Sequence, residues 1–94
     1  MYTIKRLRSF EKSIARLDRS GIKVSLKKKV LQTIHHIASG QKLSESFADH
    51  ELHGEFAGFR ECHVAGDLLL VYKIEKENLI LVLVDIGSHS QLFG

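Results

Sequence analysis

The 94-residue sequence contains no proline, only one cysteine and no long apolar run. Without proline it offers no Pro-rich linker, and no repeat or low-complexity segment divides it. The single Cys62 excludes an internal disulfide framework and is typical of a reducing compartment. No apolar stretch approaches the ~20 residues of a membrane-spanning helix, and the first residues lack the apolar core of a signal peptide. These absences predict one domain over residues 1–94, in the cytoplasm and without a membrane partner.

The charge is unevenly distributed along the chain. Residues 1–42 carry eleven Lys and Arg against two acids, a balance of +9, whereas residues 43–94 carry three against nine, a balance of −6; together they give the net charge of +3. A basic half attracts the phosphates of nucleic acid and speeds encounter with it. The alternative is that the lysines belong to solvated helix faces.

The first half of the chain has the patterns of a short strand and two helices. Residues 1–4 favour an edge strand, and Ser9 is a candidate N-cap for a helix that Gly21 ends. Apolar side chains three and four apart predict a second helix over about 23–39, with Gly40 at its C-terminal end. The short connection predicts an antiparallel helical hairpin.

After Gly40 the pattern changes to a polar loop over 41–56, followed by strands at 59–64, 68–74 and 79–86. The short turns between these strands predict antiparallel pairing. The fold class is therefore α+β in the order β-α-α-β-β-β, with a helical hairpin packed on a curved, mainly antiparallel sheet.

Four histidines in the second half lie near acidic residues, and three explanations are open. Zinc could bind His50 and His53 if their segment were helical, but the HExxH motif is absent and Cys62 stands alone, so we predict no metal. Surface side chains without a special role are the second explanation, which we apply to His35 and His36 in the predicted second helix.

Acid–base chemistry is the third explanation. Strand alternation places Glu61 and His63 on one face, Asp67 follows in the turn, and His89 lies just beyond the last strand. Histidine, with an unperturbed pKa of about 6.5, is the usual proton shuttle near neutral pH. Neighbouring carboxylates favour its protonated form, which can both donate a proton and attract an anionic substrate.

Two segments resemble YafQ-type toxins of the RelE superfamily. ADHELHGEFAGFRECHVAGDLLLVYKI (48–74) matches the family pattern D-H-x-L-x-G, then F/Y-R-[ED]-x-H-[IV]-x-x-D, then a buried strand with L-x-x-Y. GSHSQLFG (87–94) matches the ending G-[ST]-H-x-x-L-F. The chain length, the basic helical hairpin and the strand order also match, so the resemblance covers essentially the whole chain.

This resemblance implies a RelE-like fold and a ribosome-dependent mRNA endonuclease, the toxin of a type II toxin–antitoxin system. It implies a cognate antitoxin, the ribosome and mRNA as partners, and no cofactor. Acid–base roles fall to the catalytic residues His50, His63, Asp67 and His89, and substrate binding to Arg60, Glu61 and Phe93. We expect the basic half to dock on ribosomal RNA through Lys12, Arg16, Lys27, Lys28 and Lys29.

The chain departs from the family pattern at two positions. Leu68 stands where many relatives have Trp or another bulky residue, and Asp85 where relatives usually carry Arg. Two alternative functions therefore stay open: a non-enzymatic binder like the gyrase-inhibiting ParE toxins, and a degenerate toxin that keeps only its antitoxin and RNA contacts. The set of histidines speaks against a pure binder, which needs no groups that titrate near neutrality.

Overall fold

The structure, a computed structural model, describes all 94 residues. The helical hairpin and the three-stranded meander appear in the predicted order, and a short strand, two 3₁₀ turns (η1 and η2) and a C-terminal helix are added to them. The elements are β1 (Thr3–Arg6), α1 (Arg8–Arg19), α2 (Val24–Ala38), η1 (Glu45–Phe47), β2 (His50–Glu51), η2 (Gly54–Phe56), β3 (Arg60–Ala65), β4 (Leu68–Glu75), β5 (Ile80–Gly87) and α3 (His89–Phe93).

The two long helices end where their glycines predict, but α1 begins differently. Gly21 and Gly40 have φ values of +79° and +84°, the left-handed conformation that follows many helix ends. The residue that caps α1 is Leu7 rather than the predicted Ser9. The Leu7 N–H bonds to the Leu83 carbonyl at 2.9 Å, which continues the β1 pairing, and the helix starts two residues earlier than predicted. Ser9 instead donates its hydroxyl to the Val84 carbonyl.

The sheet has five strands in the order β1-β5-β4-β3-β2. The predicted antiparallel pairing of β3, β4 and β5 is confirmed. β1 is parallel to β5, because the helical hairpin carries the chain over the sheet between them. β2 lies within the segment that the sequence predicted as loop; its two residues pair with β3, with His50 opposite Glu61.

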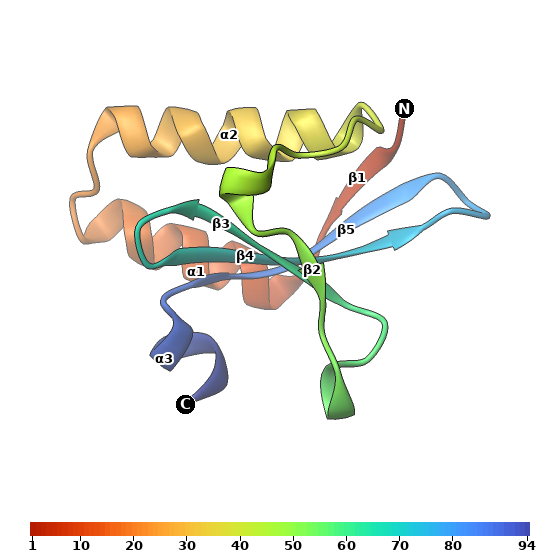
Figure 1. Cartoon of the computed structure of the whole chain (residues 1–94). Helices are drawn as coiled ribbons and strands as arrows, with labels where there is room; N and C mark the ends of the chain where they lie inside the picture. The colour runs from red at the N-terminus through yellow and green to blue at the C-terminus, as the bar shows by residue number, and fades with distance from the viewer.

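The two faces of the sheet are covered unequally. Figure 1 shows α2 along one side of the sheet and α3 with η2 on the other. The main core lies on the α2 side, where the alternating residues Cys62, Leu70 and Tyr72 join apolar side chains of the helices. Leu69 and Val71 are also buried, on the opposite face, as the apolar run in β4 predicted. No helix combines the length and apolar character needed to cross a bilayer.

Candidate active site

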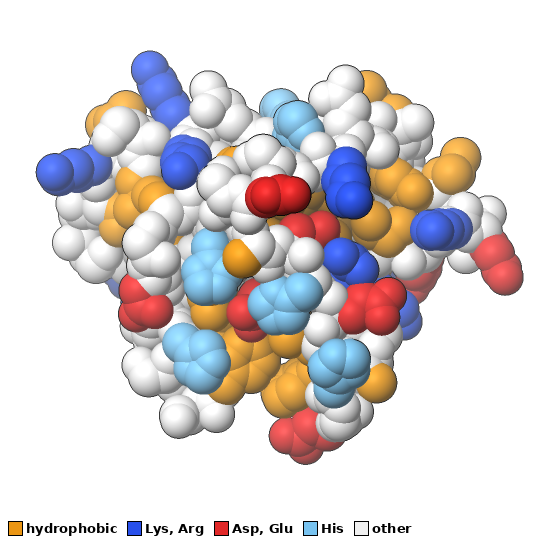
Figure 2. Space-filling view, viewed as in Figure 1, with side chains coloured by type: hydrophobic (Ala, Val, Ile, Leu, Met, Phe, Trp, Pro, Cys, Tyr) orange, Lys and Arg blue, Asp and Glu red, His pale blue; other side chains and the backbone are white.

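A buried carboxylate between two histidines lies on the sheet face opposite α2. Glu61 is only 6% exposed. The Nε2 atom of His50 lies 3.6 Å from its Oε1 atom, and the Nε2 atom of His63 lies 4.0 Å from the same oxygen. Both separations exceed hydrogen-bond length, so Glu61 is not bonded to either ring here, and a small movement would form a bond with one of them. In Figure 2, histidine side chains gather in the lower half of the view, around an acidic side chain and hydrophobic surface.

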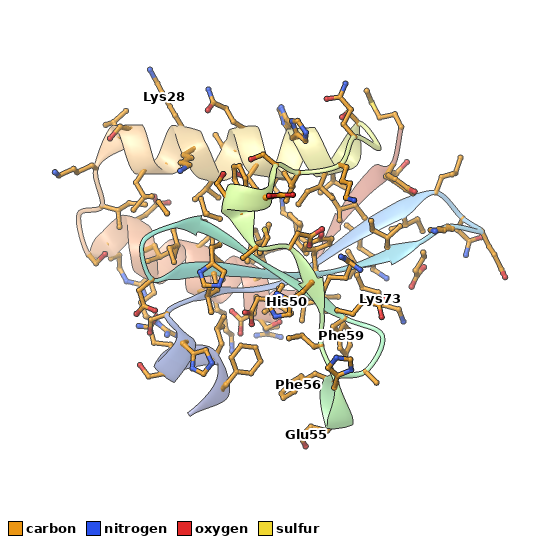
Figure 3. All side chains as sticks on the ribbon, in the orientation of Figure 1. Lys28, His50, Glu55, Phe56, Phe59 and Lys73 are labelled. Carbon is orange, nitrogen blue, oxygen red and sulfur yellow. The ribbon has the colours of Figure 1, made fainter.

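The backbone beside His50 sets the orientation of its ring. The Nδ1 atom lies 2.7 Å from the carbonyl oxygen of Ala48. Because a carbonyl only accepts hydrogen bonds, Nδ1 carries the proton, and Nε2 is left as the basic atom of the neutral ring. Ala48 has a φ of +47°, which turns the chain back so that its carbonyl reaches the ring two residues later. In Figure 3 the His50 side chain lies over the middle of the sheet.

His63 and Asp67 stand at the end of the hairpin between β3 and β4. The pairing register shifts between His63 and Ala65, a bulge of the kind that re-aims side chains next to functional sites. Asp67 is exposed in the following turn and makes no side-chain hydrogen bond or ion pair. The structure therefore joins His63 to Glu61 and leaves Asp67 on the rim, without a contact to either histidine.

His89 and Phe93 belong to α3, which folds back beneath β5. Ser88 caps this helix: its hydroxyl accepts from the Gln91 N–H, and the Gln91 side chain accepts from the Ser88 N–H. A Cβ atom on Gly87 would lie 2.9 Å from Gln91 Oε1, so a side chain at this position would displace the Gln91 amide that completes the cap. The His89 and Phe93 rings stand 5.3 Å apart, and Phe93 meets Phe56 of η2 edge-on at 5.3 Å.

Arg60 points to the other face of the sheet, away from the histidine pair. Its guanidinium donates to Asp49 at 3.2 Å and lies 3.5 Å from Glu51, and the hydroxyl of Tyr72 donates to the same Asp49 carboxylate. Burial lowers the pKa of Arg60, but its hydrogen bonds to Asp49 and Tyr72 outweigh this effect and raise the pKa above its ordinary value. The structure thus does not bring Arg60 together with the predicted catalytic histidines, because strand alternation sends it to the opposite side.

The buried thiol of Cys62 lies beside this network. Burial, followed by the negative charges of Asp49 and Glu61, raises the pKa of the Cys62 thiol to about 12. The thiol is therefore neutral at physiological pH and is no nucleophile.

Asp85, which replaces the Arg usual in relatives, does not reach the histidines. Its Oδ1 atom accepts a hydrogen bond from the Ser13 hydroxyl of α1 at 2.6 Å and another from the Ile86 N–H at 2.8 Å. The pairing register between β4 and β5 shifts beside Asp85. β1 pairs with β5 only as far as Leu83, and α1 contacts β5 beyond that point. Asp85 therefore joins the first helix to the sheet.

The five predicted RNA-docking residues have different environments. Lys27 forms an ion pair with Asp18 at 2.9 Å, while the ammonium of Lys29 lies 5.6 Å from the ring centroid of Phe47. Lys28 points away from the sheet on the outer side of α2 (Figure 3). Lys12 and Arg16 are exposed on α1.

No group of three or more His, Cys, Asp or Glu side chains is arranged to hold a metal ion. His50, Glu61 and His63 come nearest to such a set, but they supply only two imidazoles and a carboxylate at ion-pair distance. Structural and catalytic zinc sites need at least three protein ligands at about 2.0–2.3 Å.

Sequence reasoning missed three parts of the site. It assigned no role to Asp49 and Tyr72, which join in one network with Arg60. It also missed Phe56, and it missed α3, although Ser88 followed by Gln91 three residues later is a capping-box signal.

A family model described as a bacterial toxin of the type II toxin–antitoxin system, YafQ, matches residues 2–94. The chain belongs to this family. It is 33% identical over 86 residues to the putative toxin YafQ of Haemophilus influenzae, covering 89% of this chain and 84% of that protein. Over 48 residues it is 38% identical to the mRNA interferase toxin YafQ of Escherichia coli, covering 51% of this chain and 50% of that protein.

Solved structures of bacterial toxins, YafQ among them, share the fold. A metal-bound toxin from Helicobacter pylori is 40% identical with a TM-score of 0.86, and the match covers 99% of this chain and 100% of that one. A chain of the Escherichia coli DinJ–YafQ complex matches over 100% of both chains with a TM-score of 0.81; at 24% identity this similarity concerns the fold alone. The predicted membership of the YafQ family and the RelE-like α+β fold are confirmed.

Proposed function

We propose that this YafQ-family chain, a single toxin domain over residues 1–94, is a ribosome-dependent endoribonuclease that cleaves mRNA. The observation that carries this proposal is the buried Glu61 carboxylate between His50 and His63. The Escherichia coli relative is named an mRNA interferase, which supports the same class of reaction.

The cleavage needs a base for the ribose 2′-hydroxyl and an acid for the departing 5′-oxygen. His50 takes the 2′-hydroxyl proton on Nε2, since its Nδ1 atom is engaged with Ala48. The 2′-oxygen then bonds to phosphorus, the bond from phosphorus to the 5′-oxygen breaks, and a 2′,3′-cyclic phosphate is left. Glu61 stabilises the His50 imidazolium that forms, at a separation of 3.6 Å.

The remaining polar groups serve the phosphate and the leaving group. His63 as imidazolium places positive charge near the developing dianion. His89 supplies the proton to the 5′-oxygen, and its neighbour Phe93 offers a face for stacking an RNA base. We retain Asp67 as an additional proton acceptor, because its carboxylate is exposed and unpaired at the turn that follows His63.

This mechanism uses no metal ion, since side chains provide the base, the acid and the positive charge. The lack of a three-ligand set supports that assignment. A Helicobacter pylori relative has been solved with bound metal, so the role of metal in this chain requires a direct test.

We further propose that the toxin acts in the cytoplasm, where ribosomes present single-stranded mRNA to it. Lys12, Arg16 and Lys28 are exposed, and Lys28 points away from the sheet (Figure 3), so these side chains are available to contact ribosomal RNA. The Escherichia coli YafQ has been solved with DinJ in a toxin–antitoxin complex. By analogy a cognate antitoxin would restrain this toxin, with an acidic segment covering His89 and Phe93.

The test is cleavage of mRNA on programmed ribosomes between pH 5 and pH 9, with the new RNA ends identified. We expect a 2′,3′-cyclic phosphate, cleavage unchanged by EDTA, and a loss of about 10²–10⁴-fold on His89→Ala. His35→Ala is the matched control, because that exposed histidine lies on α2 away from the site. Restoration of EDTA-treated toxin by zinc would overturn the metal-free mechanism. Antitoxin binding without any cleavage would indicate the degenerate toxin.

A further inference from the structure

Three consecutive lysines of α2, residues 27–29, have different surroundings, because each side chain of a helix points about 100° away from the preceding one. Lys27 is paired with Asp18 on α1, and Lys28 points away from the sheet (Figure 3). Lys29 lies one turn before Thr33, which is 2% exposed and donates its hydroxyl to the Lys29 carbonyl at 2.7 Å. Lys29 is itself exposed, at the edge of the buried face of α2, and its ammonium lies 5.6 Å from the centroid of the Phe47 ring of η1.

A cavity of about 290 Å³ opens between α2, η1 and the end of β3. His63 lines the cavity and its Nε2 atom also lies 4.0 Å from Glu61 Oε1, so this residue joins the cavity to the candidate active site. Its lining contains no carboxylate. The lining residues are Lys29, Ser46, Phe47, Ala48, His63, Val64, Ala65 and Gly66.

We propose that this cavity is a subsite for the phosphate and ribose of the nucleotide next to the scissile phosphate, with Lys29 as the phosphate ligand. The inference rests on the proposed RNA-cleaving function and extends it to a residue and a place outside the histidine cluster. Lys29 thereby differs in role from Lys28 on the same helix, which would contact only ribosomal RNA.

The lining has the chemistry that a phosphate ester needs. The Lys29 ammonium is held over the Phe47 ring at 5.6 Å, a cation–π contact that keeps the charge at the cavity without neutralising it. The Ser46 hydroxyl lies 2.9 Å from that of Ser44, and it can donate to a phosphate oxygen when it accepts from Ser44. His63 adds positive charge when it is protonated.

The size and position of the cavity define what can enter. Its volume is near the lower end of ligand pockets, roughly 300 Å³, so it admits a phosphate with part of a sugar rather than a dinucleotide. The ring of Phe47 can contact the ribose or the base of the bound nucleotide. Because His63 is shared, a nucleotide seated here would hold its phosphate beside one of the two histidines that flank Glu61.

The experiment measures binding and cleavage separately. Adenosine 3′-monophosphate and inorganic phosphate are titrated into the isotope-labelled toxin, and the backbone signals of Ser46, Ala65 and Gly66 are followed. We expect saturable shifts there, and a loss of affinity of about 10-fold or more on Lys29→Gln. Lys29→Arg should retain most of the affinity because it keeps the positive charge, and Lys28→Gln is the matched control.

Cleavage on programmed ribosomes then tests whether the subsite serves the reaction. Lys29→Gln should lower the rate within the bound complex about 10-fold, whereas Lys28→Gln should weaken only ribosome binding. Equal nucleotide affinity of the Gln variants at both positions, or shifts confined to other residues, would overturn the subsite. Nucleotide binding that depends on Lys29 in a toxin that cleaves nothing would keep the subsite and refute the proposed function.

Discussion

Asp49, the residue just before β2, and Glu61 of β3 are two carboxylates that differ in what surrounds them. Asp49, on the face with the main core, accepts hydrogen bonds from Arg60 and from Tyr72. Glu61, on the opposite face, has two imidazoles at 3.6 and 4.0 Å as its charged partners. One carboxylate is fully compensated by a permanent cation, and the other depends on groups whose charge changes near neutral pH.

In the proposed mechanism, this difference separates stability from reactivity. The Asp49 network holds β2 against β3 and β4, and His50 is the next residue, so the stable face positions the ring that the other face uses. Glu61 stabilises a charge that appears on its neighbours only when they take up a proton. A carboxylate with a permanent partner could not respond to that event.

Replacement of Glu61 by glutamine should have the largest effect on cleavage. Glu61→Gln removes the negative charge at nearly constant shape, so we expect a loss of about 10²-fold or more in rate with little change in unfolding temperature. The measurement is cleavage on programmed ribosomes beside thermal unfolding. Glu51→Gln, on the other face in the same strand pair, is the control and should keep wild-type rate. A fully active Glu61→Gln toxin would show that cleavage does not need the negative charge of Glu61.

Truncation of Asp49 should act mainly on stability. Asp49→Ala leaves the guanidinium of Arg60 and the hydroxyl of Tyr72 without their acceptor, at a cost of about 2–3 kcal/mol. Chemical denaturation measures this loss. Tyr72→Phe removes only one bond and should cost about 1 kcal/mol. Cleavage should also fall on Asp49→Ala because His50 loses its anchor; unchanged stability would show that the network is not structural.

Asp85→Arg tests whether the family's usual arginine can be restored. Because Asp85 accepts from Ser13 and from the Ile86 N–H, the substitution should cost about 1–2 kcal/mol without raising cleavage. Ser13→Ala, which removes the same contact from the α1 side, should show a smaller loss. A clear gain in cleavage by Asp85→Arg would mean that the arginine reaches the phosphate by another route.

The smallest expected effect is the stability at high pH on the core face. Burial raises the pKa of Cys62 from 9.0 to about 12, and burial with the Asp49 hydrogen bond raises that of Tyr72 above 10.0. Above pH 9 the unfolded chain loses these protons while the folded chain keeps them, so their contribution is complete below pH 9 and is lost as pH rises. We expect Cys62 to lower the free energy of unfolding by about 1 kcal/mol between pH 8 and pH 10, measured by denaturation at both pH values. The loss over the same pH range should be smaller in Cys62→Ala.

Several parts of the molecule follow from local sequence alone. Apolar spacing and glycines located α1 and α2, and alternating or continuous apolar runs with short turns located β3, β4 and β5. Alternation along β3 also correctly separated Glu61 and His63 from Arg60. These features depend on periodicity and backbone conformation over a few residues, which the order of side chains determines directly.

Other parts were decided by contacts between distant segments. The two residues of β2 form a strand by pairing with Glu61 and Arg60 of β3, and the direction of Asp85 depends on where α1 crosses the uncovered edge of β5. The separate environments of Lys27 and Lys29 depend on α1 and on the loop that carries Phe47. A sequence shows which residues are charged. How the chain packs in three dimensions decides whether each charge gains a partner or stays exposed to solvent.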